Sequence, residues 1–364
     1  MYIKMRWIVL LSVMIFRVYI SDAQSAQLDF SGVKKFWEVM EVLQDDREPD
    51  SLLWNRLFET PGYAAIEKRE KKRTVFIKAF RYAYMPSLKK HLESALEKQD
   101  YLAGLLKHLV QVPAKKHELE LYQMELMQSF SLVKPLQKLQ RLIPDTLLKQ
   151  YAPPPVSFII FAADGRGYPD RIVSDILHIK GKLSADDFYA HELFHFYYSK
   201  LPGKIGEVDS SEQMLIDRLL YIAEEGIADM NDKIEYPFFS QQKIDTLFPE
   251  SNGRYFRDYI NTYNESSKWI EYMNTVFTAM AQDHEHAGDI GAKFNTGFHL
   301  EGRPTGAFMA KTIIDAFGYD TIKQSLHNPF SFFFIYSKAA EKTGKKPLSN
   351  IAISQLELFE RKYR

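Results

Sequence analysis

Three consecutive prolines, Pro153 to Pro155, interrupt the apolar pattern of the sequence near its middle. Proline fixes φ and has no backbone N–H, so neither a helix nor a central strand continues through such a stretch. The patterns on the two sides differ, and the 364-residue chain is long enough for each part to contribute to a sizeable core. We therefore expect a helical N-terminal region, residues 24–150, and a second region, residues 151–364.

The first part, about residues 28–148, is predicted to be a series of helices. Apolar residues recur at three- and four-residue spacing in the segments 36–43 and 102–109, as on the buried face of a helix. Residues 118–134 form another amphipathic stretch, which we expect Pro135 to end or kink. No spacing typical of a chemical motif occurs in this part of the sequence.

The second region begins with a predicted strand, because residues 156–161 are rich in β-branched and aromatic side chains. A turn signal at residues 164–167 and a second predicted strand at 171–179 indicate a short antiparallel ribbon. Helical periodicity resumes at about 212–231, and residues 297–306 are predicted to form a loop before the last helices. The predicted fold class is mainly α with a small antiparallel β element (α+β).

The first 23 residues have the pattern of a secretory signal peptide. Lys4 and Arg6 give a positive start, residues 7–16 are mainly apolar, and residues 21–23 offer small side chains for cleavage. The apolar run is shorter than the about 20 residues that a bilayer requires. We therefore expect export to the periplasm or the exterior of a bacterial cell, with a mature chain that begins near Gln24 and has no stable membrane span.

Charge and cysteine content exclude several classes of function and site. Lys plus Arg and Asp plus Glu both number 47, so the formal net charge is zero. Nucleic-acid-binding proteins usually carry a basic excess, and we expect no nucleic-acid partner. The sequence has no cysteine, so it offers neither disulfides nor thiolate ligands. A transition metal would have to be held by histidine and carboxylate side chains.

The clearest chemical motif is His191-Glu192-Leu193-Phe194-His195. Ser184, with Asp187 three residues later, resembles a capping box and predicts that a helix begins shortly before the motif. Two histidines four residues apart lie on one face of a helix, so both rings can reach one zinc ion. Glu192 can then approach a metal-bound water as the catalytic base without binding the ion itself.

The surroundings of the motif decide between a zinc site and a chance match, which arises in roughly one or two chains in a hundred of this length. A predicted strand pair and a capped helix are the context that this chemistry requires. Apolar residues also flank the histidines, namely Phe188, Leu193, Phe194 and Phe196. We therefore predict one zinc ion per chain.

A third ligand is expected from the segment YIAEEGIAD, where acidic residues interrupt an apolar helical pattern. A buried carboxylate is costly unless it is paired or bound to a metal. Glu225 is favoured over Glu224 because only Glu225 has an acidic partner, Asp229, on the same helix face; the alternative is that both glutamates are surface residues. Asp229 would then orient His191. Gly226 is small enough to let this helix approach the motif helix.

Taken together, HELFH and EEGIAD resemble the gluzincin zinc peptidases, which combine HExxH with a glutamate on a following helix. With residues 54–63 and 302–306, the chain is also similar to a little-characterised bacterial family of zinc-dependent peptidases. The resemblance implies a zincin-like architecture, a peptide or protein substrate, and Glu225 as the third ligand. The separation of 30 residues between His195 and Glu225 is longer than in the best-known gluzincins.

Three further features could take part in catalysis. The tetrahedral oxyanion needs a donor besides the metal, and His299 is the candidate, although a lone loop histidine is more often simply exposed. Arg303 could bind a substrate carboxylate or close a salt bridge. The strand at residues 156–163 could bind substrate as an added strand if its edge is exposed.

The competing function is a non-catalytic peptide- or protein-binding protein that keeps a zincin-like fold. Glu192 separates the two, because a binding protein has no chemical need for a base at that position. A zinc hydrolase with another substrate class would use the same ligands. The sequence Asp283-His284-Glu285-His286 could hold a second metal ion, although its charged neighbours favour a solvated loop. The main prediction is an exported zinc metallopeptidase.

Overall fold

The computed structural model describes residues 27–98, 100–182, 184–202, 205–247, 251–283 and 286–364. The predicted signal peptide, residues 1–23, lies outside the described residues. By its internal contacts the chain divides into two units: the first contains residues up to 136 together with 151–196, and the second contains residues 137–150 and 197–364. The domain division placed at residue 150 from the sequence stays a prediction. No helix within the described ranges is long and apolar enough to cross a membrane.

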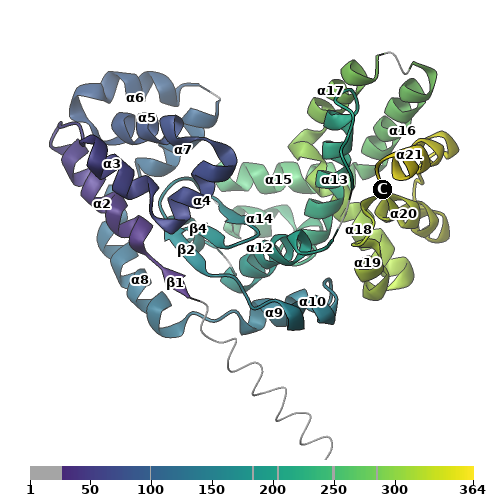
Figure 1. Cartoon of the computed structure of the whole chain (residues 1–364), viewed down its shortest axis with the longest axis horizontal. Helices are drawn as coiled ribbons and strands as arrows, with labels where there is room; N and C mark the ends of the chain where they lie inside the picture. Colours follow the sequence, from purple (N-terminus) through teal and green to yellow (C-terminus); the bar gives the residue numbers. More distant parts are fainter. Residues whose placement is uncertain (1–26, 99, 183, 203–204, 248–250, 284–285) are drawn as a thin grey trace, which may run out of the picture. The chain divides into compact units, whose positions relative to one another are not determined.

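The first unit consists of helices around a small sheet (Figure 1). The helices predicted over residues 36–43 and 102–109 are confirmed by α2 and α7. The elements of this unit before the prolines are β1 (Leu28–Asp29), α2 (Ser31–Gln44), α3 (Ser51–Phe58), α4 (Pro61–Glu70), α5 (Arg73–Tyr84), η1 (Pro86–Leu88), α6 (Lys89–Leu96), α7 (Tyr101–Leu109), η2 (Pro113–Lys115), α8 (Lys116–Ser129) and α9 (Val133–Leu139). After the prolines come β2 (Val156–Ile159), β3 (Gly165–Gly167), β4 (Ile172–Asp175), α11 (Ile176–Lys180) and α12 (Ala185–Ser199).

Among the described residues, four strands form one mixed sheet in the order β1–β2–β4–β3. β1, β2 and β4 are parallel, with Val156 opposite both Leu28 and Ile172, whereas β3 runs antiparallel to β4. The mainly helical fold class is confirmed, but the predicted antiparallel ribbon is wrong. The residues expected to form its turn contain β3, and β2 pairs with β4 in parallel. Both of these strands are fully buried, as parallel strands covered on two faces are.

The position of β2 within the sheet removes one predicted role. β2 lies between β1, which pairs with Val156 and Ser157, and β4, which pairs along the whole of β2, and residues 156–161 are buried. The expectation that residues 156–163 add a substrate strand at an exposed edge is therefore wrong. β1, which the helical pattern did not distinguish from its surroundings, covers one edge of β2.

Helix α12 carries the HExxH motif and begins where the sequence predicts. The Ser184 Oγ atom accepts a hydrogen bond from the Asp187 backbone N–H at 3.2 Å, which confirms the N-terminal cap. Strand β3 lies directly against this helix: a Cβ atom on Gly167 would be 2.2 Å from the backbone oxygen of Glu192. Because only glycine fits at this distance, Gly167 lets the outer strand of the sheet contact the motif.

The second unit is helical throughout the part of it that the structure describes (Figure 1). Helix α13 packs against α17, α18 and α20, and its buried side chains form the centre of this unit. The elements are α10 (Asp145–Gln150), α13 (Gln213–Ala228), η3 (Tyr236–Phe238), α14 (Gln241–Leu247), α15 (Ser251–Asn264), α16 (Ser266–Gln282), α17 (Ala287–Gly297), η4 (His299–Gly302), α18 (Arg303–Phe317), α19 (Tyr319–Ser325), α20 (Pro329–Thr343) and α21 (Asn350–Tyr363).

Helices α13 and α18 cross with their backbones in contact at two glycines. A Cβ atom on Gly226 would lie 2.2 Å from the carbonyl carbon of Gly306, and one on Gly306 would lie 2.0 Å from the backbone oxygen of Ile222. The sequence predicted that Gly226 allows a close approach to the motif helix. That approach stays a prediction; within the second unit, the atoms nearest to a Cβ on Gly226 belong to Gly306 of α18.

Two boundary predictions also need correction. The helix expected over residues 118–134 ends at Ser129, and Pro135 lies in the first turn of α9, where its missing N–H is not needed. The loop expected over residues 297–306 is shorter, because α17 continues to Gly297 and α18 begins at Arg303. Pro304 suits the first turn of α18 for the same reason as Pro135 suits α9.

Candidate metal centre

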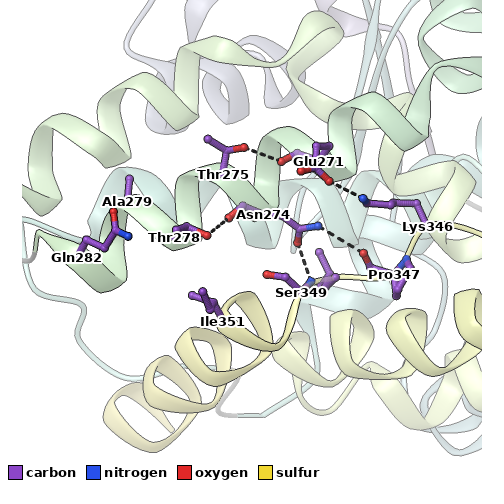
Figure 2. Close-up of a pocket in the computed structure, with 11 residues that line it drawn as sticks. Glu271, Asn274, Thr275, Thr278, Ala279, Gln282, Lys346, Pro347, Ser349 and Ile351 are labelled. Atoms are coloured by element: carbon purple, nitrogen blue, oxygen red, sulfur yellow. Dashed lines mark hydrogen bonds and ion pairs between the residues drawn. The ribbon is translucent and has the colours of Figure 1, made fainter.

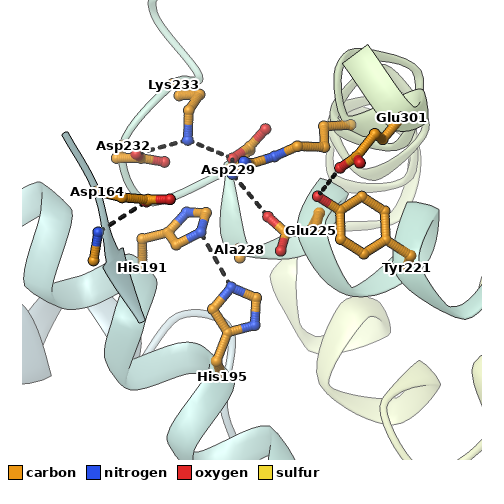
Figure 3. Close-up of polar contacts among 12 residues, drawn as sticks. Asp164, His191, His195, Tyr221, Glu225, Ala228, Asp229, Asp232, Lys233 and Glu301 are labelled. Atoms are coloured by element: carbon orange, nitrogen blue, oxygen red, sulfur yellow. Dashed lines mark hydrogen bonds and ion pairs between the residues drawn. The ribbon is translucent and has the colours of Figure 1, made fainter. Parts of the chain in front are cut away.

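His191 and His195 converge on the same side of α12. Their Nε2 atoms are 3.1 Å apart, and His191 is only 4% exposed. Figure 3 shows the two rings turned toward each other. Two nitrogens that each bind a tetrahedral zinc ion at roughly 2.0–2.1 Å are themselves about 3.3 Å apart. The pair therefore fits a shared zinc ion, and each ring offers one nitrogen as ligand.

Glu192 lies on α12 next to β3, the outer strand of the sheet. Its side chain is 7% exposed, and its backbone oxygen contacts Gly167 of β3. The neighbouring strand residue, Arg166, is close enough for Glu192 to help raise the pKa of Arg166. A positive charge on β3 thus lies near the carboxylate that the sequence assigns as the base.

Arg166 is held on β3 by other acidic groups. Its Nε atom donates to Glu70 Oε1 at 3.1 Å, and its Nη1 atom donates to Asp164. Burial works to lower the pKa of Arg166, but the carboxylates of Asp164 and Glu70 outweigh it and the pKa is raised. Tyr168 also donates to Glu70 Oε1, at 2.7 Å. These contacts fix the charged strand beside the motif.

The carboxylates predicted from the sequence lie on α13 and its C-terminal cap, in the second unit. Arg303 joins them: its Nη2 atom is 2.7 Å from Glu225 Oε2 and 3.3 Å from Asp229 Oδ1. Burial works to lower the pKa of Arg303, yet Glu225 and Asp229 raise it well above its ordinary value. Of the two alternatives for Arg303, the salt bridge is the one that the structure contains.

Asp229 is fully buried within a group of donors. Lys233 Nζ donates to Asp229 Oδ1 at 2.6 Å and Tyr259 donates to Oδ2 at 2.8 Å. Lys233 also contacts Asp232 at 2.8 Å, so a buried ammonium lies between two carboxylates (Figure 3). Burial works to lower the pKa of Lys233, but Asp229 and Asp232 raise it. The role of Asp229 in orienting His191 stays a prediction.

Glu225 and Glu224 have different surroundings. Glu225 is partly buried beside Arg303, and its carboxylate can offer one oxygen to a metal ion. Glu224 lies near Tyr198, whose pKa is raised first by burial and then by this carboxylate. The choice of Glu225 as the third ligand stays a prediction. The salt bridge to Arg303 is the structural feature that distinguishes Glu225 from Glu224.

The segment before α18 contains an unusual backbone. Leu300, Glu301 and Gly302 have φ values of 47°, 57° and 84°, all in the left-handed region. His299, which precedes them, is exposed, and its assignment as oxyanion donor stays a prediction. The left-handed turn leads directly to Arg303.

The second unit also contains a groove. This groove lies between α16 and the segment before α21 (Figure 2). There the Asn274 amide donates to Pro347 O at 3.4 Å, and its oxygen accepts from Ser349 N at 2.8 Å. The residues that line this groove include no histidine, so it does not match the predicted zinc chemistry.

The second histidine-containing segment is described only in part, because residues 284 and 285 lie outside the described residues. His286 Nδ1 is 2.8 Å from Asp283 Oδ2, and both side chains are exposed. The hydrogen bond from His286 to Asp283 raises the pKa of His286. The hypothesis of a second metal ion there stays a prediction.

Sequence reasoning missed several of the charged and polar residues that contact one another around Arg166 and around Asp229. Lys233 follows Asp229 by four residues, a spacing that places two residues on one helix face and could have suggested the pair. The contacts of Tyr259 with Asp229 and of Arg166 with Glu70 gave no such signal, because they join residues 30 and 96 positions apart.

Comparison with known proteins adds one family. Residues 54–345 match a family model described as "Putative zinc dependent peptidase (DUF5700)". The matched range contains the histidines of α12, the carboxylates of α13 and Arg303. No curated protein and no solved structure matches the chain.

Proposed function

The chain belongs to this "putative zinc dependent peptidase" family, and from that premise we propose that it hydrolyses peptide bonds at a single zinc ion. His191, His195 and Glu225 would hold the ion, as in gluzincin-type peptidases of zincin-like fold. The observation that carries the proposal is the 3.1 Å approach of the two Nε2 atoms on α12. The family match supports both the metal and the reaction class.

A zinc ion held by His191, His195 and Glu225 would supply an open position at which a water molecule becomes more acidic and the scissile carbonyl is polarised. Glu192 is about 100° around the helix from His191, so its carboxylate can reach the attacking water. Glu192 accepts a proton from that water as the oxygen adds to the scissile carbonyl carbon. It then passes the proton to the amine nitrogen as the C–N bond breaks, so that the peptide yields a carboxylic acid and an amine.

Three finer assignments belong to the same proposal. His299 would donate a hydrogen bond to the tetrahedral oxyanion. Asp229 would accept a hydrogen bond from His191 and so fix the tautomer of that ring. The signal-like start of the sequence supports export to the periplasm or the exterior, where peptide or protein substrates would be met.

The test is peptide hydrolysis by the purified chain that begins at Gln24. A peptide mixture of diverse sequence is incubated with the zinc-loaded protein, and new termini are identified by mass spectrometry. We expect cleavage that stops when a chelator removes the metal and returns when one equivalent of zinc is added. Zinc-loaded protein that binds peptides without cleaving any would favour the non-catalytic binding function instead.

A further inference from the structure

Arg303 occupies the space between two carboxylates that share one face of α13. Glu225 and Asp229 are four residues apart, so their negative charges repel each other along the helix. One guanidinium nitrogen of Arg303 is 2.7 Å from Glu225 Oε2 and 3.3 Å from Asp229 Oδ1. The arginine therefore neutralises both charges and ties the two side chains together.

The position of Arg303 is fixed by the left-handed turn that precedes it. Two of the three residues in this turn, Leu300 and Glu301, are not glycine, and such a conformation persists only when its surroundings enforce it. The surroundings here belong to α13. Arg218 Nη1 donates to the backbone oxygen of Glu301 at 2.9 Å, and Tyr221 donates to Glu301 Oε2 at 2.7 Å.

The other side of Arg303 is fixed by the glycine crossing. Gly306 follows Arg303 by three residues, about one helical turn, and its backbone touches that of α13. This contact between backbones fixes the point at which α18 crosses α13. Arg303 therefore lies between the turn at residues 300–302, which Arg218 and Tyr221 hold by hydrogen bonds, and the backbone contact of Gly306 with α13. Both neighbours fix its position relative to the carboxylates of α13.

We propose that Arg303 is a positioning residue for the metal centre, which holds the Glu225 carboxylate in the orientation that binds the ion. This inference rests on the proposed function, because it concerns the ligand named there. Arg303 acts through Glu225 and takes no part in the reaction itself. An oriented carboxylate loses less conformational freedom when the metal binds, so the affinity for zinc is higher.

The experiment compares zinc affinity in the wild type, Arg303→Gln and Arg303→Lys, by competition with a chelator of known affinity. Loss of a group that orients a ligand weakens metal binding about 10- to 100-fold, and we expect this for Arg303→Gln. Arg303→Lys keeps a cation on a shorter side chain, so we expect partial rescue to an affinity about threefold to tenfold below the wild type. Arg257→Gln is the matched control, since Arg257 forms a pair of exposed side chains with Asp245 at 2.9 Å.

A second readout separates positioning from general stabilisation. Cobalt can replace zinc, and its visible absorption reports the geometry of the ligands; we expect Arg303→Gln to shift these bands and the control to leave them unchanged. A merely structural role for Arg303 would lower the melting temperature without changing either the affinity of the folded protein or the cobalt spectrum.

Each outcome bears on a different claim. A folded Arg303→Gln protein with wild-type zinc affinity and cobalt spectrum would overturn the positioning role while leaving the proposed function intact. If that variant does not fold, wild-type affinity in Arg303→Lys would overturn it instead. A wild type that binds no zinc would overturn the proposed function itself.

Discussion

The two sides of the proposed metal centre are built on different principles. On α12 the histidines lie among aromatic side chains, with Phe194 6.0 Å from the ring of His195 and Phe188 buried in the same helix. On α13 the carboxylates lie among charges, and Asp229 alone contacts Lys233, Tyr259 and Arg303. An imidazole can be buried without a counter-charge, whereas a carboxylate cannot.

This difference has consequences for how each side responds to mutation. The residues of α12 that we propose to act, His191, Glu192 and His195, lie on one helix. We therefore expect substitutions of these residues to act mainly on chemistry and metal binding. The carboxylate side depends on partners from distant segments, so substitutions there should act on the stability of the second unit as well. Four predictions test this contrast.

The largest effect is expected from Glu192→Gln on the α12 side. The amide cannot accept the proton of water, and loss of a general base lowers turnover by about 10³-fold. Zinc content and folding should remain at wild-type levels, because Glu192 is not one of the three proposed ligands. Asp186→Asn, which removes a partly exposed carboxylate from the same helix, should retain full activity. An active Glu192→Gln enzyme would contradict the mechanism.

The next effect is expected from Asp229→Asn on the α13 side. Asp229 is fully buried, and its loss leaves Lys233 and Arg303 in a buried position with one fewer anion. Breaking such a group costs about 3–5 kcal/mol of unfolding free energy, measured by urea denaturation. The exposed carboxylate of Asp245, replaced by asparagine, should cost no more than about 1 kcal/mol. Equal losses of unfolding free energy in Asp229→Asn and Asp245→Asn would mean that burial of the Asp229 contacts does not contribute to stability.

A smaller effect should follow from Gly226→Ala. The added methyl group would lie 2.2 Å from the backbone of Gly306, so α18 must shift, at a cost of about 2 kcal/mol. Gly104→Ala on α7 is the control, because a Cβ atom there meets nothing within 4 Å. Alanine is the better helix former, and this control should gain up to about 1 kcal/mol. Thermal unfolding of both variants measures the difference, and a neutral Gly226→Ala would contradict the close crossing.

The smallest effect is the dependence of stability on pH through His178, which packs against an aromatic side chain of α12. His178 packs against Phe188, with ring centroids 6.1 Å apart, and burial, aided by the charge of Lys182, lowers its pKa well below the ordinary value. The unfolded chain therefore takes up a proton near pH 6.5 while the folded chain does not, and stability is lost as the pH falls below that value. The loss is at most about 1.4 kcal/mol for each pH unit.

His178→Gln removes this proton-linked loss. Urea denaturation at pH 7, 6 and 5 should show a steeper decline for the wild type than for His178→Gln. Parallel declines in the wild type and His178→Gln would show that the buried ring is not responsible.

The same contrast explains how far the sequence could lead. The cap at Ser184 and the two histidines lie within one helix, and their relationship follows from helical spacing alone. The salt bridge of Arg303 to Asp229 joins residues 74 positions apart, and the hydrogen bond of Tyr259 joins residues 30 apart. No periodicity in the sequence connects them, because the connection arises from tertiary packing.

The sheet was mispredicted for a related reason. β1 contains two residues and β3 three, which is too short for an alternating pattern to stand out from the neighbouring helices and turns. Parallel pairing of β2 with β4 leaves both strands uniformly buried, so neither shows the alternation by which an antiparallel ribbon is recognised.

The measurement that tests the central claim most directly is the zinc content of the purified mature chain beside His195→Ala and Glu225→Ala. The account predicts about one zinc ion per wild-type chain, and its loss or sharp reduction in both variants. One substitution removes a ligand from each side of the centre, so the pair tests both sides at once. A wild type without zinc after reconstitution, or full zinc content in both variants, would contradict the account.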